Sequence, residues 1–216
     1  MAYNKKDVPL VVVRRLPRYY RHLSELLKQG VTRISSKELS RRMSVTASQI
    51  RQDFNCFGEF GQQGYGYNIE NLRSEIADIL GLKNGYKTIL LGAGNLGQAL
   101  ANHSNFKKRG FELIGIFDNN PDIIGNVIAG IEVIDVSKLA EFMEERKPDI
   151  AILALPKTAV QQMAKLLCKL GIKGLWNFSY IDIDTPIDVP LENVHLSDSL
   201  MTLSYNITKK LENDEH

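Results

Sequence analysis

The chain has 216 residues, 44% of them hydrophobic, which is enough for one or two compact domains with buried cores. We expect no membrane span, because no run of about 18 apolar residues occurs. We also expect no signal peptide, because the short apolar patch near the start lacks a small-residue cleavage site. The two cysteines, Cys56 and Cys168, lie far apart. Their spacing excludes a disulfide framework and a zinc site, and favours a cytoplasmic protein.

Charge is divided unevenly along the chain. Residues 1–60 carry 12 Lys/Arg against 5 Asp/Glu, whereas residues 61–216 carry 15 against 20. This asymmetry indicates nucleic acid as the partner of the basic segment. A basic surface that is merely solvated would give the same counts, so charge alone leaves both interpretations open.

A first helix is predicted from apolar residues at steps of four, three and four. This stripe consists of Leu16, Tyr20, Leu23 and Leu27. Pro17 suits the first turn, where its missing N–H is not needed, and Gly30 suits the end of the helix.

Two further helices begin at capping boxes, in which a hydroxyl caps the helix and a side chain three residues later reaches back. The boxes pair Ser35 with Glu38 and Thr46 with Gln49. Two short capped helices separated by a tight turn predict a helix-turn-helix.

The second of these helices is expected to face DNA. Its inner face is predicted to hold Ala47, Ile50, Phe54 and Phe57. The side chains left pointing outward suit base edges and phosphates; they are Ser48, Gln49, Arg51, Gln52 and Asn55. An ordinary three-helix packing unit with a polar outer face is the alternative.

Glycines and aromatic residues alternate between Phe57 and Tyr67. Glycine permits a tight hairpin whose backbone approaches another surface closely. Beside a helix-turn-helix, such a hairpin predicts a wing that touches the DNA backbone. The further DNA-binding candidates are Gly58, Gln62, Gln63 and Tyr65 in the wing, with Arg14 and Arg18 ahead of it.

An apolar run at 87–91 predicts a buried strand that enters a GxGxxG motif. In this motif the first glycine makes the turn, the second lets the backbone approach a pyrophosphate, and the third lets the next helix pack closely. The helix N-terminus adds N–H groups and a positive dipole. The motif is weak evidence alone, but a second strand at 112–117 gives it its context. Its residues are all cofactor-binding candidates: Gly92, Ala93, Gly94, Asn95, Leu96 and Gly97.

Asp118 ends the second strand, 21 residues past the last glycine of the motif. An acid at this distance is placed to accept hydrogen bonds from the adenine ribose and to repel a 2′-phosphate, which favours NAD(H) over NADP(H). The alternative is an acid that only stabilises the turn that follows. We include Asn119 with Asp118 among the cofactor-binding candidates.

Strand and helix patterns alternate over the rest of this segment. The predicted strands are 131–134, 149–155 and 173–178, and the predicted helices are 137–146 and 158–170. This alternation predicts an α/β fold with a doubly wound parallel sheet. Because ligands bind beyond the carboxyl ends of such strands, Ala154, Leu155 and Pro156 are expected to border a nucleotide crevice.

A last helix carries an apolar stripe made of Leu196, Leu200, Leu203, Ile207 and Leu211. The stripe could pair with a second copy of the chain or pack back on its own sheet. A dimer would suit a helix-turn-helix that reads a palindrome. We therefore expect a winged-helix domain at 1–85, a Rossmann domain at 86–195 and a dimerisation helix at 196–216.

Over nearly its whole length the chain resembles the Rex family of redox-sensing transcriptional repressors. The motifs that carry the resemblance are 15–21, 50–54, 57–67, 92–97, 117–118, 171–174 and 177–178. The resemblance implies a winged helix joined to a Rossmann domain, and a homodimer with a swapped C-terminal helix. It also implies binding to double-stranded palindromic operator DNA, released when NADH replaces NAD+.

The chain departs from the family at the nicotinamide side. His103 stands where the family has a tyrosine, and His195 stands where it has an aspartate; Arg21, which answers that aspartate, is retained. We count both histidines as cofactor-binding candidates. Replacing the carboxylate by imidazole removes an anion expected to complement the nicotinamide cation, which predicts altered redox discrimination. Neutral substitution at both positions is the alternative.

The chain also departs at the DNA side. Gln52, Gln62 and Gln63 stand where lysine or arginine is expected. Each lost phosphate contact lowers the slope of log affinity against log salt by about 0.9. We therefore predict a shallower salt dependence, or a different operator preference, than in a typical member.

Two other functions stay open. In a small NAD-dependent enzyme, His103, His195 or Tyr180 could supply an acid or base, but no lysine–tyrosine pair or metal cluster at catalytic spacing accompanies them. In a DNA-binding scaffold, the Rossmann domain would hold a nucleotide only structurally or be empty.

Overall fold

The computed structural model describes residues 8–58, 61–62, 65–186 and 188–214. The chain divides into two compact units, Met1–Asn84 and Gly85–His216. The elements of the first unit are α1 (Leu10–Val13), α2 (Leu16–Lys28), β1 (Arg33–Ile34), α3 (Ser36–Met43), α4 (Ala47–Asn55), β2 (Gly61–Gln62), β3 (Gly66–Asn68) and α5 (Ile69–Ile79).

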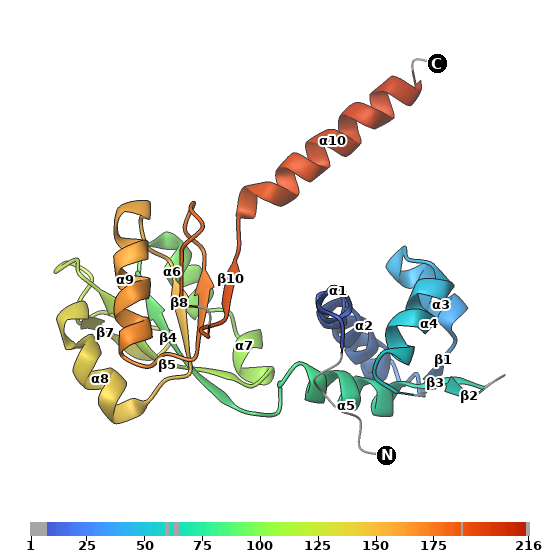
Figure 1. Ribbon diagram of the computed structural model, residues 1–216, viewed down its shortest axis with the longest axis horizontal. Coiled ribbons are helices and arrows are strands. Elements are labelled where there is room, and N and C mark those ends of the chain that lie inside the picture. Colours follow the sequence, from blue (N-terminus) through green and yellow to red (C-terminus); the bar gives the residue numbers. More distant parts are fainter. Residues whose placement is uncertain (1–7, 59–60, 63–64, 187, 215–216) are drawn as a thin grey trace. The chain divides into compact units, whose positions relative to one another are not determined.

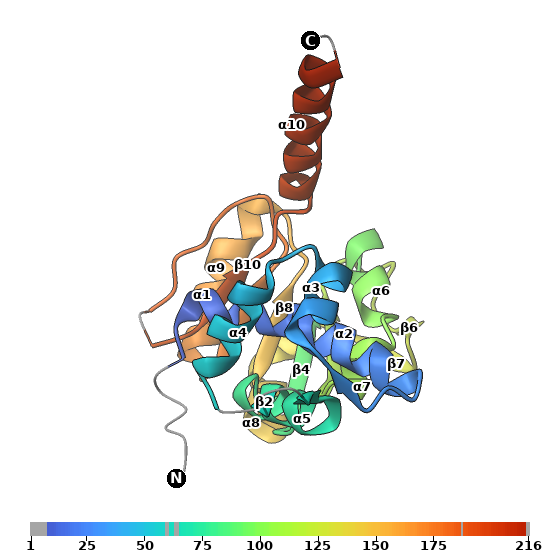
Figure 2. The same ribbon diagram turned by 90° about the vertical axis from the view of Figure 1, so that its right-hand side faces the viewer.

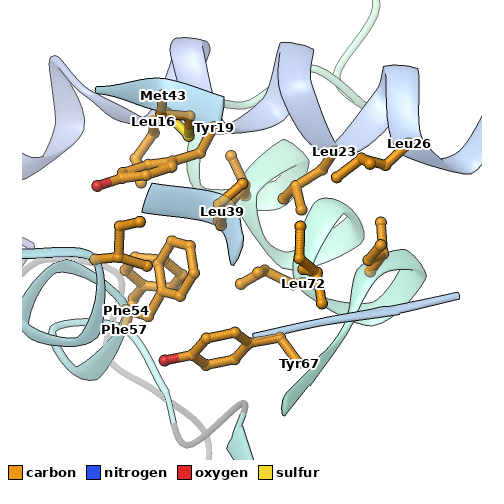
Figure 3. Close-up of a cluster of buried hydrophobic side chains, with 14 of the residues drawn as sticks. Leu16, Tyr19, Leu23, Leu26, Leu39, Met43, Phe54, Phe57, Tyr67 and Leu72 are labelled. Atoms are coloured by element: carbon orange, nitrogen blue, oxygen red, sulfur yellow. The ribbon is translucent and has the colours of Figure 1, made fainter. Parts of the chain in front are cut away.

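The first unit is a winged helix. Its three short strands form an antiparallel sheet in the order β1-β3-β2, and α3 and α4 form the helix-turn-helix. The apolar side chains of α2, α4, α5 and the sheet meet in one core, shown in Figure 3. At the tip of this sheet Gly66 has φ +69°, and a Cβ there would lie 2.7 Å from the carbonyl oxygen of Ile34.

The buried face of α2 lies one residue away from the predicted stripe. Leu16 and Leu23 are fully buried as expected, but their partners are Tyr19 and Leu26, while Tyr20 and Leu27 lie at the margin of the core. Steps of three, four and three satisfy helical periodicity as well as the predicted steps do. Tyr19 is selected because its ring packs edge-on against Phe54, 5.0 Å between centroids.

In each capping box, only the hydrogen bond accepted by the capping hydroxyl is present. Ser35 Oγ accepts from the N–H of Glu38 and Thr46 Oγ1 from the N–H of Gln49, both at 3.1 Å. The second bond of each box was wrongly predicted. Among the described residues, neither the side chain of Glu38 nor that of Gln49 bonds to the backbone of its capping residue. The carboxylate of Glu38 instead lies 3.7 Å from Arg42, and Gln49 turns inward.

The second unit is a Rossmann-like α/β domain, which confirms the predicted fold class. Its sheet has the order β10-β9-β8-β4-β5-β7-β6 and is parallel except for β6. Helices α8 and α9 cover one face and α6 and α7 the other (Figure 1). The strands are β4 (Tyr86–Leu91), β5 (Phe111–Asp118), β6 (Val127–Ile128), β7 (Ile131–Asp135), β8 (Ile150–Leu153), β9 (Gly174–Asn177) and β10 (Leu191–Asn193), and the helices α6 (Asn95–Ala101), α7 (Asn105–Lys108), η2 (Val136–Lys138), α8 (Leu139–Arg146), α9 (Lys157–Lys169) and α10 (Leu196–Asp214).

Two predicted elements differ clearly in extent. The strand expected at 149–155 is only Ile150–Leu153, because the chain turns at the crevice after Leu153. The helix expected at 137–146 opens with a 3-10 turn, η2. The elements β6, β10 and α7 were not predicted, since runs of two to four residues carry no periodic signal.

The apolar stripe of α10 is open. Leu196, Leu200, Leu203, Ile207 and Leu211 are each between 52% and 67% exposed, along an uninterrupted helix that Figure 2 shows end to end. The alternative in which this stripe packs against its own sheet is therefore wrong. Among the described residues, no helix is long and apolar enough to cross a membrane.

Candidate nucleotide crevice and DNA-facing helix

The three glycines of the GxGxxG motif differ in what surrounds them. Gly92 has φ +96°, and a Cβ there would lie 2.3 Å from the carbonyl oxygen of Ala154. At Gly97 a Cβ would lie 1.9 Å from the carbonyl oxygen of Gly92, so α6 can pack against β4 only without a side chain. At Gly94 a Cβ would meet nothing within 4 Å. The first and third glycines therefore build the loop, whereas the second keeps it open on its outer side.

Asp118 joins the end of β5 to this loop. Its Oδ2 accepts from the N–H of Ala93 at 2.6 Å, and its Oδ1 accepts from the N–H groups of Asn119 and Asn120 at 2.8 and 2.9 Å. Asp118 is thus also the turn acid that the sequence left open. An ionised carboxylate offers about four acceptor positions, so about one is left for a hydroxyl outside the chain.

The carboxyl ends of β8, β9 and β10 extend the same edge of the sheet. Ala154 donates its N–H to Leu91 at 2.9 Å, which holds the start of the Ala154–Pro156 segment beside the glycine loop. The side chain of Asn177, fully buried at the end of β9, donates to the carbonyl of Ile181 and to Asn193, both at 2.8 Å. These bonds fix the turns that follow the two strands. Of the glycine loop, Gly94 and Asn95 are exposed and Leu96 is half-buried.

The two candidate histidines occupy different surroundings. His103 is exposed just after α6, with its ring edge-on to Phe106 at 4.6 Å between centroids. His195 follows β10, and its Nε2 lies 3.1 Å from Oδ1 of Asp182, in the loop after β9. Asp182 therefore places a carboxylate beside the imidazole of His195. Asp182 was not predicted, because no spacing in the sequence connects it with His195.

In the winged helix, α4 carries a buried carboxylate on its inner face. Asp53 is 1% exposed and accepts from Arg15 at 2.7 and 2.6 Å, from the hydroxyl of Tyr19 at 2.7 Å and from the amide nitrogen of Gln49 at 2.8 Å. Burial opposes ionisation of Asp53, but the bonds from Arg15, Tyr19 and Gln49 outweigh it and hold the pKa of the carboxyl below its ordinary value. Burial, reinforced by the bond to Asp53, raises the pKa of Tyr19 far above its ordinary value.

This carboxylate changes the predicted face of α4. Gln49 was expected to point outward, but its side chain is half-buried because it donates to Asp53. The sequence carries one signal of this arrangement: Asp53 occupies the apolar spacing of Ile50, Phe54 and Phe57. An acid on an apolar face requires partners.

The other α4 candidates are exposed as predicted: Ser48, Arg51, Gln52 and Asn55. Two arginines also make contacts within the unit. Arg51 donates to Ser36 Oγ at 3.2 Å, which ties α4 to the first turn of α3, and Arg18 donates to the carbonyl of Met43 at the end of α3. Both therefore hold the helix-turn-helix together as well as presenting charge.

The remaining candidates lie at the start of the unit and in the wing. Arg14 is exposed at the end of α1, and Gly58 follows α4. In the wing, Tyr65 is 71% exposed and Gln62 lies in β2 opposite Gly66. Gln63 lies outside the described residues.

Comparison with known proteins gives consistent matches for both units. Residues 7–55 match the family model described as "Putative DNA-binding protein N-terminus", and residues 83–181 match the CoA binding domain. A redox-sensing transcriptional repressor Rex of Caldanaerobacter subterraneus subsp. tengcongensis is 59% identical over 95% of this chain and 92% of its own length. The protein of the same name from Clostridium botulinum is 54% identical over 95% of this chain and 98% of its own length.

Two solved structures match the fold. The structure of RSP in complex with NAD+ and operator DNA aligns with a TM-score of 0.88 at 55% identity, covering 96% of each chain. The structure of RSP in complex with NADH aligns with a TM-score of 0.89 at 52% identity, covering 96% of this chain and 98% of that one.

Proposed function

The chain belongs to the Rex family of redox-sensing transcriptional repressors, and from this we propose that it binds palindromic operator DNA and releases it when NADH replaces NAD+. The winged helix supplies the DNA contacts and the Rossmann domain the NAD(H) site. The protein acts as a homodimer in the cytoplasm.

One observation carries the ligand side of this proposal: the open space at Gly94 beside the carboxylate of Asp118. A pyrophosphate needs close approach to backbone N–H groups at a helix start, and a ribose hydroxyl needs an acceptor at the end of the next strand. The loop offers the first and Asp118 the second. Ala154, Leu155 and Pro156 line the same edge, which leads toward His195.

On the DNA side, the exposed residues of α4 and the wing residue Tyr65 form the contact surface. Gln52, Gln62 and Gln63 give that surface fewer charges than lysine or arginine would. The shallower salt dependence therefore stays a prediction of the proposal. Measuring operator affinity against salt concentration for the wild type and for Gln62→Arg/Gln63→Arg tests it. The double variant should bind the operator more tightly, and its affinity should fall more steeply with salt.

The effector side must distinguish two nucleotides that differ by the charge of one ring. A ligand shifts a two-state protein only through differential affinity, and moving from 1:99 to 99:1 needs about 5.5 kcal/mol. Three parallel strand spacings separate β4 from β10, about 14 Å, a span comparable with a bound dinucleotide. The pair His195–Asp182 then faces the nicotinamide end and supplies the polar groups that sense its charge.

The enzyme alternative is not favoured. The relatives at 54–59% identity are transcriptional repressors, and a dehydrogenase has no use for a basic winged helix. The scaffold alternative differs from the proposal only in its response to NADH.

The deciding experiment is an electrophoretic mobility assay on a palindromic operator duplex with NADH or NAD+ added. Release by NADH, and retention with NAD+, supports the redox sensor. Binding that neither nucleotide changes supports the scaffold. Protein that binds no duplex under either condition contradicts the proposal.

A further inference from the structure

The amide of Gln49 has one permitted orientation. Its partner Asp53 is ionised and accepts hydrogen bonds from three side chains, so it can face only the nitrogen of the amide. The distance from Gln49 Nε2 to Asp53 Oδ1 is 2.8 Å. An amide free of such a partner can rotate by half a turn and exchange donor for acceptor. Gln49 cannot do so without placing its oxygen against a buried carboxylate.

Its carbonyl oxygen is left available. Among the hydrogen bonds of the described residues, none uses Oε1 of Gln49. The residue is the third of α4, in the first turn of the helix, where a recognition helix contacts base edges. Its neighbours Ser48 and Gln52 are exposed, so this part of α4 is open to a ligand.

We propose that the Oε1 of Gln49 accepts a hydrogen bond from one base of each operator half-site. Asp53 holds the nitrogen of the amide and so fixes Gln49 as an acceptor toward DNA. The inference rests on the proposed function, since it requires operator binding through α4. In the major groove, the donors that an acceptor can select are the exocyclic amino groups of adenine N6 and cytosine N4. Guanine and thymine present acceptors at the corresponding positions and are rejected. Asp53 is therefore a positioning residue for base recognition.

Gln52 offers a matched comparison. It is the same side chain one turn further along α4, exposed, and among the described residues its amide bonds to no carboxylate. Its amide can therefore rotate and either donate or accept. If the contact with Asp53 is what makes Gln49 select an amino group, Gln52, which lacks that contact, should not make the same selection.

The test begins with selection of duplexes from a library of randomised inverted repeats by the wild-type protein. The selected site is then assayed with Gln49→Met, which keeps length but removes hydrogen bonding, and with Gln52→Met. We expect Gln49→Met to lose about fivefold of the discrimination at one adenine or cytosine per half-site, the lower end of the range for a bidentate pair, because Gln49 offers the base a single acceptor. Gln52→Met should keep the preference at that position. Thermal unfolding checks that both variants are folded.

Modified bases test whether Gln49 accepts a hydrogen bond from the base. At the position assigned to Gln49, the amino group is replaced by hydrogen, using purine for adenine or pyrimidin-2-one for cytosine. The replacement should weaken the wild type but not Gln49→Met. At an adenine, dependence on N7, removed in 7-deazaadenine, with no dependence on the amino group would overturn the inference. So would Gln49→Met keeping every base preference of the wild type. Wild-type protein that selects no sequence would instead remove the proposed function itself.

Discussion

Asp53 and Arg15 lie 38 positions apart in the chain, yet their side chains meet in two hydrogen bonds of 2.7 and 2.6 Å. The carboxylate is 1% exposed and the arginine side chain 32% exposed. The contact joins the N-terminal end of α2, a helix of the winged-helix core, to α4, which carries the side chains proposed to face DNA. It therefore links the stability of the unit to the geometry of its recognition helix.

Replacing Asp53 by asparagine should destabilise the winged helix by about 3 kcal/mol, the lower end of the range for breaking a buried ion pair. The lower end applies because Arg15 is partly exposed and can be hydrated. Urea unfolding monitored by circular dichroism measures the change. Glu38→Gln, which removes a surface pair of 3.7 Å, is the control and should cost about 0.5 kcal/mol or less. Equal effects of the two substitutions would contradict the prediction.

Acid should weaken the winged helix through the same carboxylate. The pKa of Asp53 is held below its ordinary value, so its contribution to stability is complete above about pH 4. That contribution disappears as pH falls through the lowered pKa of the folded state. We expect the free energy of unfolding to fall between pH 5 and pH 2, less steeply in Asp53→Asn. Some slope will remain, since the bonds from Lys173 and Lys87 outweigh burial and lower the pKa of Asp149 in the other unit. Parallel slopes would exclude Asp53 as the source.

Substitutions at two glycines of the loop should have different effects, one on NADH affinity and the other on stability. Gly94→Ala adds a methyl group where nothing lies within 4 Å, so the melting temperature should change little. Its NADH affinity should fall at least tenfold, because the methyl group occupies the approach of the pyrophosphate. Gly97→Ala places a methyl group 1.9 Å from a carbonyl oxygen and should destabilise the domain. Fluorescence of Trp176, the only tryptophan of the chain, measures binding. Unchanged affinity in Gly94→Ala would argue against the site.

His195 should influence the preference between the two nucleotides, because the nicotinamide ring is cationic in NAD+ and neutral in NADH. His195→Asp places a carboxylate at this position and should raise the affinity for NAD+ relative to NADH. His195→Asn, which adds no negative charge, is the control and should leave the affinity ratio close to that of the wild type. Titration of both nucleotides with the three proteins measures the ratio, and an unchanged ratio in His195→Asp would count against the prediction.

The open stripe of α10 should hold two copies of the chain together. Leu203→Lys places a charge at the centre of the stripe and should convert the dimer to a monomer, lowering operator affinity about 100-fold or more. Thr202→Lys adds the same charge on the opposite side of the helix and should leave the dimer intact. Light scattering after size-exclusion chromatography reports the mass. Wild-type protein that is monomeric would contradict the prediction.

Sequence patterns predicted the architecture because it follows from local signals. Strand and helix periodicity, the glycine motif and the two capping residues Ser35 and Thr46 each act within a few residues. The glycine motif also predicted the separate roles of Gly92, Gly94 and Gly97, since each role follows from backbone geometry.

Side-chain partners distant in the sequence were not predictable. The pairs Asp53–Arg15 and His195–Asp182 depend on how helices and loops pack, and no spacing rule connects them. The inward turn of Gln49 follows from the first pair. The one-residue shift of the buried face of α2 has the same origin, since periodicity alone does not choose between Tyr19 and Tyr20.

The N–H groups of Ala93 and Asn119 donate to Asp118, so these bonds are made by the chain's own groups alone. A loop already held in its final shape loses little conformational entropy when a ligand settles on it. Exchange of one nucleotide for another then requires no rebuilding of the protein at this end. The response time of such a receptor is expected to be governed by ligand escape, which would let it follow rapid swings in cellular reducing power.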